Sequence, residues 1–399
     1  MLRSFSAEFR LAAACAMWPP CDRRTEAIRA AASESLDWTR FLRVAKRHWV
    51  LGLAHQGLTE ARPAVPPEIR QEIGARVATL VRENLAMAAE ALRLQRLFDE
   101  AHLPVLFVKG SSLAMLAFGN LGLSGSQDID LLVPREALPA AMELVARAGY
   151  CRSNPPPGTS DTQLRQLLPL RRDLGFVHQT TGLQMELHWR LFANQHAMAE
   201  DTIMAASREV LLTNTRGLRT LGDEDLFAYL CMHGALHCWN RLKWLADVNA
   251  LLASMPEARL EGLVRAAEVR RTGLAVAQAL LLCRRLFGTT LSGRLMGPLD
   301  KSATIRWLEA TALEAMTTGH GEQDARDARF GMTRGSLSTF LLSGSWHYRL
   351  KELSLHLNNQ TDILMMPLSE RLRFLSPFLR LPLWVLRHAA KQTSRKADP

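Results

Sequence analysis

The sequence predicts an α+β protein with a small mixed β-sheet flanked by N-terminal and C-terminal helical regions. Three observations support this fold class. Apolar residues recur at helical spacing in the first hundred residues, short strand-like runs separated by glycine-containing turns follow, and helical spacing returns afterwards. We therefore expect an N-terminal helical region at 1–103, a β/α core at 104–222, and a C-terminal helical region with a basic tail at 223–399.

The N-terminal region is predicted to be helical throughout. LDWTRFLRVAKRHWVLGLAHQGL has helical spacing, and after the breaker ARPAVPPE a long periodic segment runs from about Ile69 to Glu100. The opening MLRSFSAEFRLAAACAMWPP is interrupted by Glu8 and Arg10, so we interpret it as a helix rather than an export signal. No apolar run approaches the roughly 20 residues that cross a bilayer. These features predict a cytoplasmic protein.

The middle of the chain changes to short strands. PVLFVKG is typical of a buried strand, SSLAMLAFG of a short helix, and DIDLLV of a second strand that ends at Pro134. REALPAAMELVARAGY is predicted to be a helix and residues 152–162 an irregular loop. LGFVHQTTGLQMELHWRLF predicts two strands joined by a turn at Gln179–Gly182.

Helices are expected again from Asp223, which is a candidate N-cap for the segment DLFAYLCMHGALHCWNRLKWLADVNALLA. Residues 257–290 and 301–318 continue the helical spacing, whereas 319–345 are polar and glycine-rich and predict a loop. The last segment is basic and amphipathic, with two interrupting prolines.

The formal charge of +10 is concentrated at the end of the chain. From Arg371 onward, seven Lys or Arg residues stand against one Asp. A basic tail suits nucleic acid, anionic lipid or an acidic partner, so contact with a membrane surface is one expectation. The six cysteines are scattered without a C-x-x-C pair, which predicts free thiols in a reducing compartment.

The first candidate site is a set of carboxylates on two strands. Alternate strand residues share a face, so Asp128 and Asp130 are expected to point the same way, opposite Ile129 and Leu131. Glu186 is a third carboxylate on the polar face of a strand whose other face is apolar. Because such carboxylates repel one another when buried, they predict a divalent cation. Oxygen ligands suit Mg²⁺, and three carboxylates suit two ions that assist phosphoryl displacement.

The second candidate site is the turn that precedes these aspartates. Lys109, Gly110, Ser111 and Ser112 lie where a strand leads into a short helix. Glycine allows the backbone to approach phosphate oxygens, free N–H groups at a helix start favour an anion, and the serine hydroxyls and the lysine add donors and charge. The turn therefore predicts a nucleotide-binding element.

The sequence resembles the polymerase-beta-like nucleotidyltransferase superfamily, and within it an uncharacterised nucleotidyltransferase family. The resemblance rests on a Gly-Ser turn, then Asp-x-Asp in a strand, then a carboxylate in a later strand. Further matching pieces occur in the same order: LDWTRFLRVAKRHWV, LPVLFVKG, DIDLLV, MELHWRLF and HGALHCWNRLKWLADV, with a Pro/Arg-rich end.

The resemblance implies that Asp128, Asp130 and Glu186 are the catalytic, metal-binding residues and that Gly110 and Ser111 lie under the triphosphate. Two departures are visible. The related sequences usually have an arginine four residues before the first aspartate, where this chain has Ser124, and the gap between the Gly-Ser turn and Asp128 is longer than in compact members. The first departure removes a phosphate or structural contact and favours weakened activity.

The segment after Asp223 carries a further polar cluster. His233 and His237 are one turn apart, but residue 234 is glycine and no third ligand is evident, so zinc is not favoured. The resemblance suggests that this helix faces the site, with Lys243 meeting phosphates and Asp247 orienting it as an i,i+4 partner. The alternative interpretations are hydrogen-bonded structural histidines, including His188, and an ordinary surface ion pair.

We therefore expect a Mg²⁺-dependent enzyme that moves an NMP from an NTP, with ATP as the expected donor, to a hydroxyl acceptor and releases pyrophosphate. The acceptor is a small molecule or a protein side chain, and RNA is not favoured because no aromatic-basic stacking platform is evident. The alternative is a catalytically weak nucleotide-binding or scaffolding component of a biosynthetic assembly. A third reading is a peripheral membrane accessory held by the C-terminal segment.

Overall fold

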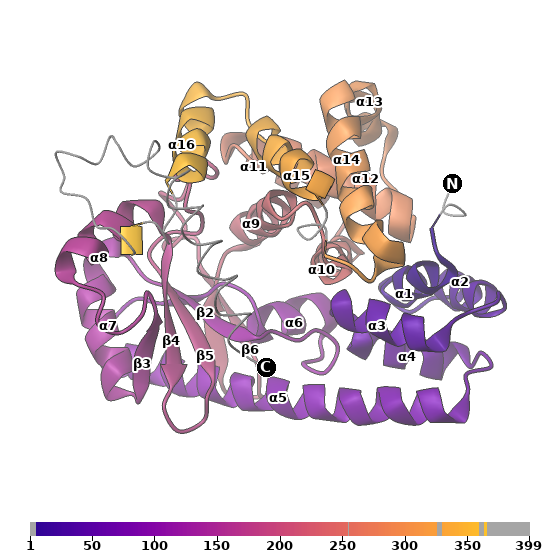
Figure 1. Cartoon of the computed structure of the whole chain (residues 1–399), viewed down its shortest axis with the longest axis horizontal. Helices are drawn as coiled ribbons and strands as arrows, with labels where there is room; N and C mark the ends of the chain where they lie inside the picture. The colour runs from indigo at the N-terminus through magenta and orange to yellow at the C-terminus, as the bar shows by residue number, and fades with distance from the viewer. Residues whose placement is uncertain (1–4, 254, 325–328, 359–362, 365–399) are drawn as a thin grey trace, which may run out of the picture.

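The computed structural model describes residues 5–253, 255–324, 329–358 and 363–364 (Figure 1). The predicted α+β architecture is confirmed, because helices flank a small mixed sheet on both sides in sequence. The basic tail from Arg371, with its predicted membrane-surface contact, lies outside the described residues. Among the described helices, none combines the length and hydrophobicity that a bilayer-spanning segment requires.

The N-terminal region is helical, as predicted. Its helices are α1 (Ala7–Cys15), α2 (Asp22–Ala32), α3 (Trp38–Arg47), α4 (Leu51–Ala61) and α5 (Pro67–Glu100). Pro67 at the first position of α5 suits a helix start, because its missing N–H has no helical partner there. Figure 1 shows α5 running along one side of the molecule beneath the sheet.

Five strands form the central sheet in the order β1-β2-β5-β4-β3. Their bounds are β1 Leu106–Phe107, β2 Asp128–Leu132, β3 Tyr150–Asn154, β4 Asp173–His178 and β5 Gln184–His188. Strands β2 and β5 are parallel, and the other neighbours are antiparallel. The intervening helices are α6 (Ser111–Phe118), α7 (Leu138–Arg147) and α8 (Asp161–Leu167), with 3₁₀ turns at Arg135–Ala137 and Leu168–Leu170. The predicted strand pair around Gln179–Gly182 is present as β4 and β5.

The sheet has one apolar and one polar face. On the apolar face, Leu131, Met185 and Leu187 pack with Leu94 and Phe98 of α5 in one buried cluster. Removing this apolar surface from water stabilises the sheet at roughly 25 cal/mol per Å². The alternation of side chains then places the carboxylates of β2 and β5 on the opposite face. Burial of one face thus fixes which residues are presented on the other.

Helices dominate again after a second, two-stranded sheet. This hairpin consists of β6 (Arg208–Leu211) and β7 (Gly217–Thr220). The helices that follow are α9 (Asp223–Leu236), α10 (Leu242–Ala253), α11 (Glu257–Val269), α12 (Gly273–Phe287), α13 (Gly293–Lys301), α14 (Ala303–Thr317), α15 (Arg329–Leu341) and α16 (Trp346–Leu357), with a 3₁₀ turn at Thr318–Gly321. One buried cluster joins apolar residues of the N-terminal helices, the core and these C-terminal helices. The three-part division of the chain stays a prediction.

Two predicted loops are partly regular in the structure. Residues 150–154 form the edge strand β3, although 152–162 were predicted to be irregular. Only Tyr150 of this strand is buried, so it lacks the alternating apolar pattern that marks a half-buried strand. Similarly, α15 occupies much of the predicted loop at 319–345. Its packing against α14, α9 and α16 outweighs its glycine and serine content.

The single helix predicted from Asp223 is two helices that meet at a sharp turn. Asp223 is the first helical residue, and Gly222 before it is the N-cap. The break follows α9, where Cys238 and Trp239 both have φ near +50°. The Trp239 N–H donates to the Gly234 carbonyl at 2.7 Å, and the indole is completely buried. Burial of this large aromatic side chain offsets the strained backbone that redirects the chain into α10.

Candidate active site

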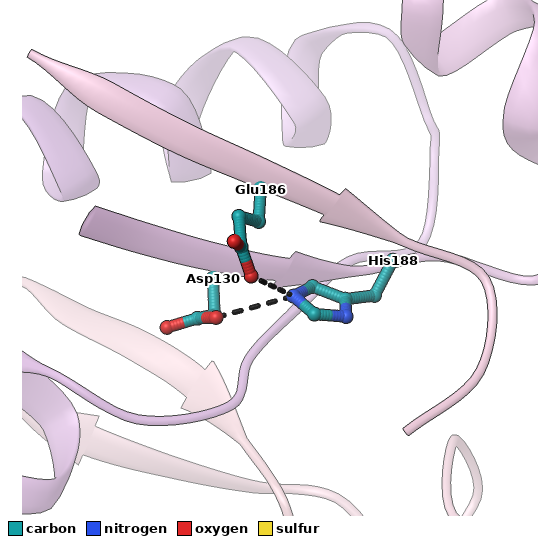
Figure 2. A group of neighbouring side chains, drawn as sticks. All are labelled: Asp130, Glu186 and His188. Atoms are coloured by element: carbon teal, nitrogen blue, oxygen red, sulfur yellow. Dashed lines mark hydrogen bonds and ion pairs between the residues drawn. The ribbon is translucent and has the colours of Figure 1, made fainter. Parts of the chain in front are cut away.

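The register of the two parallel strands brings the central acidic residues together. Asp130 of β2 is directly opposite Glu186 of β5, and Leu132 is opposite His188. Figure 2 shows Asp130 and Glu186 converging on one imidazole nitrogen. The His188 Nε2 lies 3.1 Å from Asp130 Oδ1 and 3.3 Å from Glu186 Oε2. The strand prediction therefore placed these side chains on the correct face.

Asp128 lies on the same face, where it contacts Lys109 and Ser126 rather than His188. Its Oδ1 is 3.3 Å from Lys109 Nζ and accepts a hydrogen bond of 3.3 Å from the Ser126 hydroxyl. Lys109 Nζ also lies 2.7 Å from Asp130 Oδ2, so its ammonium group bridges the two aspartates. Lys109 follows β1, whose antiparallel pairing with β2 brings it beside both acids. This lysine is part of the site rather than an isolated charge at a strand end.

The ion pairs set the electrostatics of the group. Burial alone favours the neutral form of Asp130, but Lys109 and His188 outweigh it and hold the pKa of the Asp130 carboxyl below its ordinary value. Burial and the nearby Asp130 raise the pKa of Asp128. Burial opposes the charged form of His188, yet its bonds to Asp130 and Glu186 raise its pKa. The site therefore combines a firmly ionised aspartate with a second carboxylate that ionises less readily.

Asp130, Glu186 and His188 fit a divalent cation. One ligand atom from each lies within 4.8 Å of the other two. Asp130 Oδ2 is buried and accepts no hydrogen bond of good geometry in the described structure, although the Lys109 ammonium is close. Two carboxylates and an imidazole are common ligands of divalent ions, and the imidazole suits transition metals better than Mg²⁺. The role of Asp128 as a further ligand, and a second ion, stay predictions.

The turn after Lys109 has the backbone that an anion site needs. Gly110 is the N-cap of α6 with φ 76° and ψ −126°, a conformation that favours glycine. The first N–H groups of α6 have no helical acceptors and carry the positive end of the helix dipole. Ser112 differs from the prediction in one respect. Its side chain is fully buried, and its hydroxyl donates to the carbonyls of Phe107 and Lys109, so this hydroxyl is not available as a donor to a ligand.

The cluster predicted on the helix after Asp223 divides into two parts. The rings of His233 and His237 lie 4.8 Å apart between centroids with a tilt of 58°, and both contact the Trp244 ring. Burial, together with nearby His237, Lys109 and Arg172, lowers the pKa of His233 well below its ordinary value. His233 is therefore a neutral imidazole beside the site, with a buried Nδ1 that has no hydrogen-bond partner in the described structure. This environment agrees with an aromatic packing role rather than zinc binding.

Lys243 and Asp247 form the predicted i,i+4 pair, and Ser124 joins them in a buried triad that the sequence did not predict. Lys243 Nζ is 2.6 Å from Asp247 Oδ2, and the Ser124 hydroxyl donates to Asp247 Oδ1 at 3.0 Å. Asp247 is almost completely buried, so this pair is not the ordinary surface ion pair of the alternative interpretation. Burial raises the pKa of Asp247, while Lys243 and Ser124 oppose that rise. The residue that departs from the family pattern thus has a specific partner here.

The sequence analysis did not identify two residues near the site, Arg172 and Tyr229. Arg172 donates from Nε to Asp173 Oδ2 at 3.2 Å and from Nη1 to the Leu191 carbonyl at 3.0 Å. Its pKa is raised because Tyr229, Asp173, Glu186 and Asp130 outweigh the effect of burial. Tyr229 of α9 is completely buried, which raises the pKa of its hydroxyl to about 12. The signal in the sequence was weak, because an arginine before a strand and a tyrosine in a helix are common.

The mixed sheet, the acidic pair on its two parallel strands and the helix that begins after a glycine N-cap together define the class of protein as a nucleotidyltransferase fold. Residues 34–288, more than half of the chain, match a protein family described as "Uncharacterised nucleotidyltransferase". The chain belongs to this family, and the predicted resemblance is confirmed. No match was found among curated proteins.

Proposed function

We propose that the protein is a divalent-metal-dependent enzyme that transfers an NMP from an NTP, with ATP as the expected donor, to a hydroxyl acceptor. The observation that carries this proposal is the register of β2 and β5, which sets Asp130 and Glu186 side by side with His188 against both. The start of α6, which begins two residues after Lys109, offers N–H groups for the triphosphate. Family membership supports the general class of reaction.

The reaction needs one bond to form and one to break. The acceptor hydroxyl oxygen attacks the α-phosphorus, and the bond to the β-phosphate oxygen breaks, so pyrophosphate leaves with the bonding electrons. The hydroxyl proton passes to Glu186, whose carboxylate is about one-third exposed and has His188 as its ion-pair partner. Asp130, Glu186 and His188 would hold a divalent cation, which would offset negative charge and lower the pKa of the attacking hydroxyl.

Positive side chains of the chain offset the charge of the phosphates. Lys109 is held between Asp128 and Asp130, and a cation on those carboxylates would free it to contact a phosphate oxygen. The negative charges of Glu186 and Asp130 help to raise the pKa of the Arg172 guanidinium. In this proposal Arg172 offsets negative charge on the leaving pyrophosphate oxygen or on the attacking hydroxyl oxygen. The Mg²⁺ preference, the nucleobase and the acceptor are parts of the proposal.

The test is pyrophosphate release by the purified protein with each NTP, with Mg²⁺ or Mn²⁺, and with cell extract as the source of acceptor. We expect extract-dependent release that Asp130→Asn and Asp128→Asn abolish. Asp201→Asn is the matched control, because Asp201 is exposed and outside the site. Labelled nucleotide then identifies the product. Turnover by folded Asp130→Asn at the wild-type rate would contradict the proposal.

One observation favours a second function. Lys109 Nζ lies within ion-pair distance of both Asp128 and Asp130, so a divalent cation would have to displace it, an arrangement that suits a nucleotide-binding scaffold with weak catalysis. NTP binding measured by calorimetry, without pyrophosphate release under any of the above conditions, would favour this alternative. Release that depends on Asp130 would exclude it.

A further inference from the structure

A large cavity lies next to the carboxylate site, between the end of α9 and the helices α14, α15 and α16. Its volume is about 670 Å³, which is in the range of pockets that enclose a small organic molecule. Figure 1 shows these helices on the side of the molecule opposite α5. Much of the lining is apolar and includes Phe192, Leu236 and Leu355.

Arg172 connects the cavity to the candidate active site. Its side chain lines the cavity, while its pKa responds to the charges of Glu186 and Asp130. It is also held in place by Asp173, which is directly opposite His188 in the pairing of β4 and β5. A molecule in the cavity can therefore contact Arg172, whose bonded neighbour Asp173 lies opposite a residue of the acidic site.

The arginines in the cavity wall form ion pairs with carboxylates, whereas one of the wall's carboxylates has no arginine or lysine partner among the described residues. Arg334 forms an ion pair with Glu314 and lies over the Trp307 ring, and Arg172 is paired with Asp173. Glu352 differs, because Lys and Arg side chains of the described structure do not contact it. Its Oε2 accepts a hydrogen bond of 3.0 Å from the Asn194 amide, and His356 Nδ1 lies 3.8 Å from its Oε1.

The Glu352 carboxylate, whose described polar partners are the Asn194 amide and the more distant His356 imidazole, favours a cationic ligand. Glu352 is only 7% exposed, and a buried carboxylate is costly unless a positive group pairs with it. The neighbouring apolar surface in turn favours a hydrophobic body over a heavily hydroxylated one. We infer that the cavity is the acceptor site and binds a small amine with an apolar body, whose ammonium group pairs with Glu352 and whose hydroxyl reaches the carboxylate site. The acceptor role rests on the proposed function, but the binding of the amine does not.

The test needs no nucleotide. Phenylethanolamine serves as the probe, and phenylethylene glycol is its neutral counterpart of nearly the same shape. Calorimetry is expected to show about tenfold weaker binding of the glycol, because a hydrogen bond to a charged group is lost. Glu352→Gln keeps an acceptor for Asn194 and is expected to remove the preference for the amine. Glu143→Gln, an exposed carboxylate on α7, is the matched control.

The cavity also offers an internal reporter of location. Cys238 lines it, whereas Cys21 and Cys151 are exposed elsewhere. Phenylethanolamine is expected to protect Cys238 from N-ethylmaleimide, as read by peptide mass spectrometry, and to leave the other two reactive. Equal binding of the two probes, no effect of Glu352→Gln, no binding, or binding without protection of a reactive Cys238 would each overturn the inference. Amine binding without any pyrophosphate release would instead contradict only the proposed transfer.

Discussion

Replacing Lys109 by Met tests whether this side chain is the counter-ion of the acidic site. The lysine ammonium lies 2.7 Å from Asp130 Oδ2 and 3.3 Å from Asp128 Oδ1. Its removal leaves two neighbouring carboxylates, of which Asp130 is almost completely buried. Breaking a buried ion pair by removing one partner costs about 3–5 kcal/mol. We expect the lower end of this range, about 3 kcal/mol, because His188 still pairs with Asp130.

The same variant makes a prediction about metal binding. Once Lys109 is gone, a divalent cation no longer competes with an ammonium group for the aspartates, so it should bind the variant more tightly. A ligand at a hundred times its Kd stabilises the folded state by about 2.7 kcal/mol, which is close to the expected loss. Mg²⁺ or Mn²⁺ is therefore expected to restore most of the stability of Lys109→Met and to stabilise the wild type less.

The assay is urea unfolding followed by tryptophan fluorescence, first with a chelator and then with each metal. Lys46→Met is the matched control, because Lys46 is exposed and lies outside the acidic site. The control is expected to unfold like the wild type under all conditions. A Lys109→Met protein as stable as the wild type in chelator would refute the counter-ion role. Equal metal stabilisation of both proteins would refute the competition.

Four other substitutions test different parts of the structure. In the same urea titration, Gly234→Ala should lower the free energy of unfolding by about 1–3 kcal/mol, because an added Cβ would lie 2.4 Å from the buried Trp239 ring. Gly74→Ala should instead stabilise α5 slightly, because an added Cβ at that position meets open space. Ser124→Ala should cost about 1–2 kcal/mol by the same measurement, because buried Asp247 loses a donor; an unchanged value would show that the bond contributes nothing. Burial raises the pKa of Glu200 to about 7. In this pH range the folded state keeps a proton on Glu200 that the unfolded state has lost. The free energy of unfolding should therefore fall by up to about 3 kcal/mol as the pH rises from about 4.5 to about 7, and Glu200→Gln should remove this pH dependence.

The helices and the sheet of the core could be predicted from the sequence because their patterns are local. Alternation in DIDLLV and in LQMELHW is enough to place Asp130 and Glu186 on one face, since successive strand residues point in opposite directions. The parallel register of β2 and β5 is not local. It depends on packing against α5 and α7, and it is this register that puts the two carboxylates opposite each other.

The parts that the sequence did not reveal depend on contacts between distant segments. Ser124 and Asp247 are 123 residues apart, and their hydrogen bond requires the C-terminal helices to pack against the core. The turn between α9 and α10 was missed because the helical spacing continues through it, while burial of Trp239 outweighs the local preference. Arg172 acquires its place beside the acids only through the pairing of β4 with β5. A single sequence carries no local signal for any of these.

The structure changes the meaning of the departure at Ser124. An arginine at that position would bring a positive charge close to the first aspartate, and its absence favoured weakened phosphate binding. In this chain, however, the serine hydroxyl and the Lys243 ammonium both bind the carboxylate of Asp247. The buried positive charge is therefore supplied from α10 instead of from the loop before β2. Lys243 also lies close enough to His233 to lower the pKa of that imidazole, so it is near the same neutral histidine as Lys109 and Arg172. Cations from three separate segments thus lie near one buried imidazole, and under the proposed function they are the candidates to offset the charge of a triphosphate.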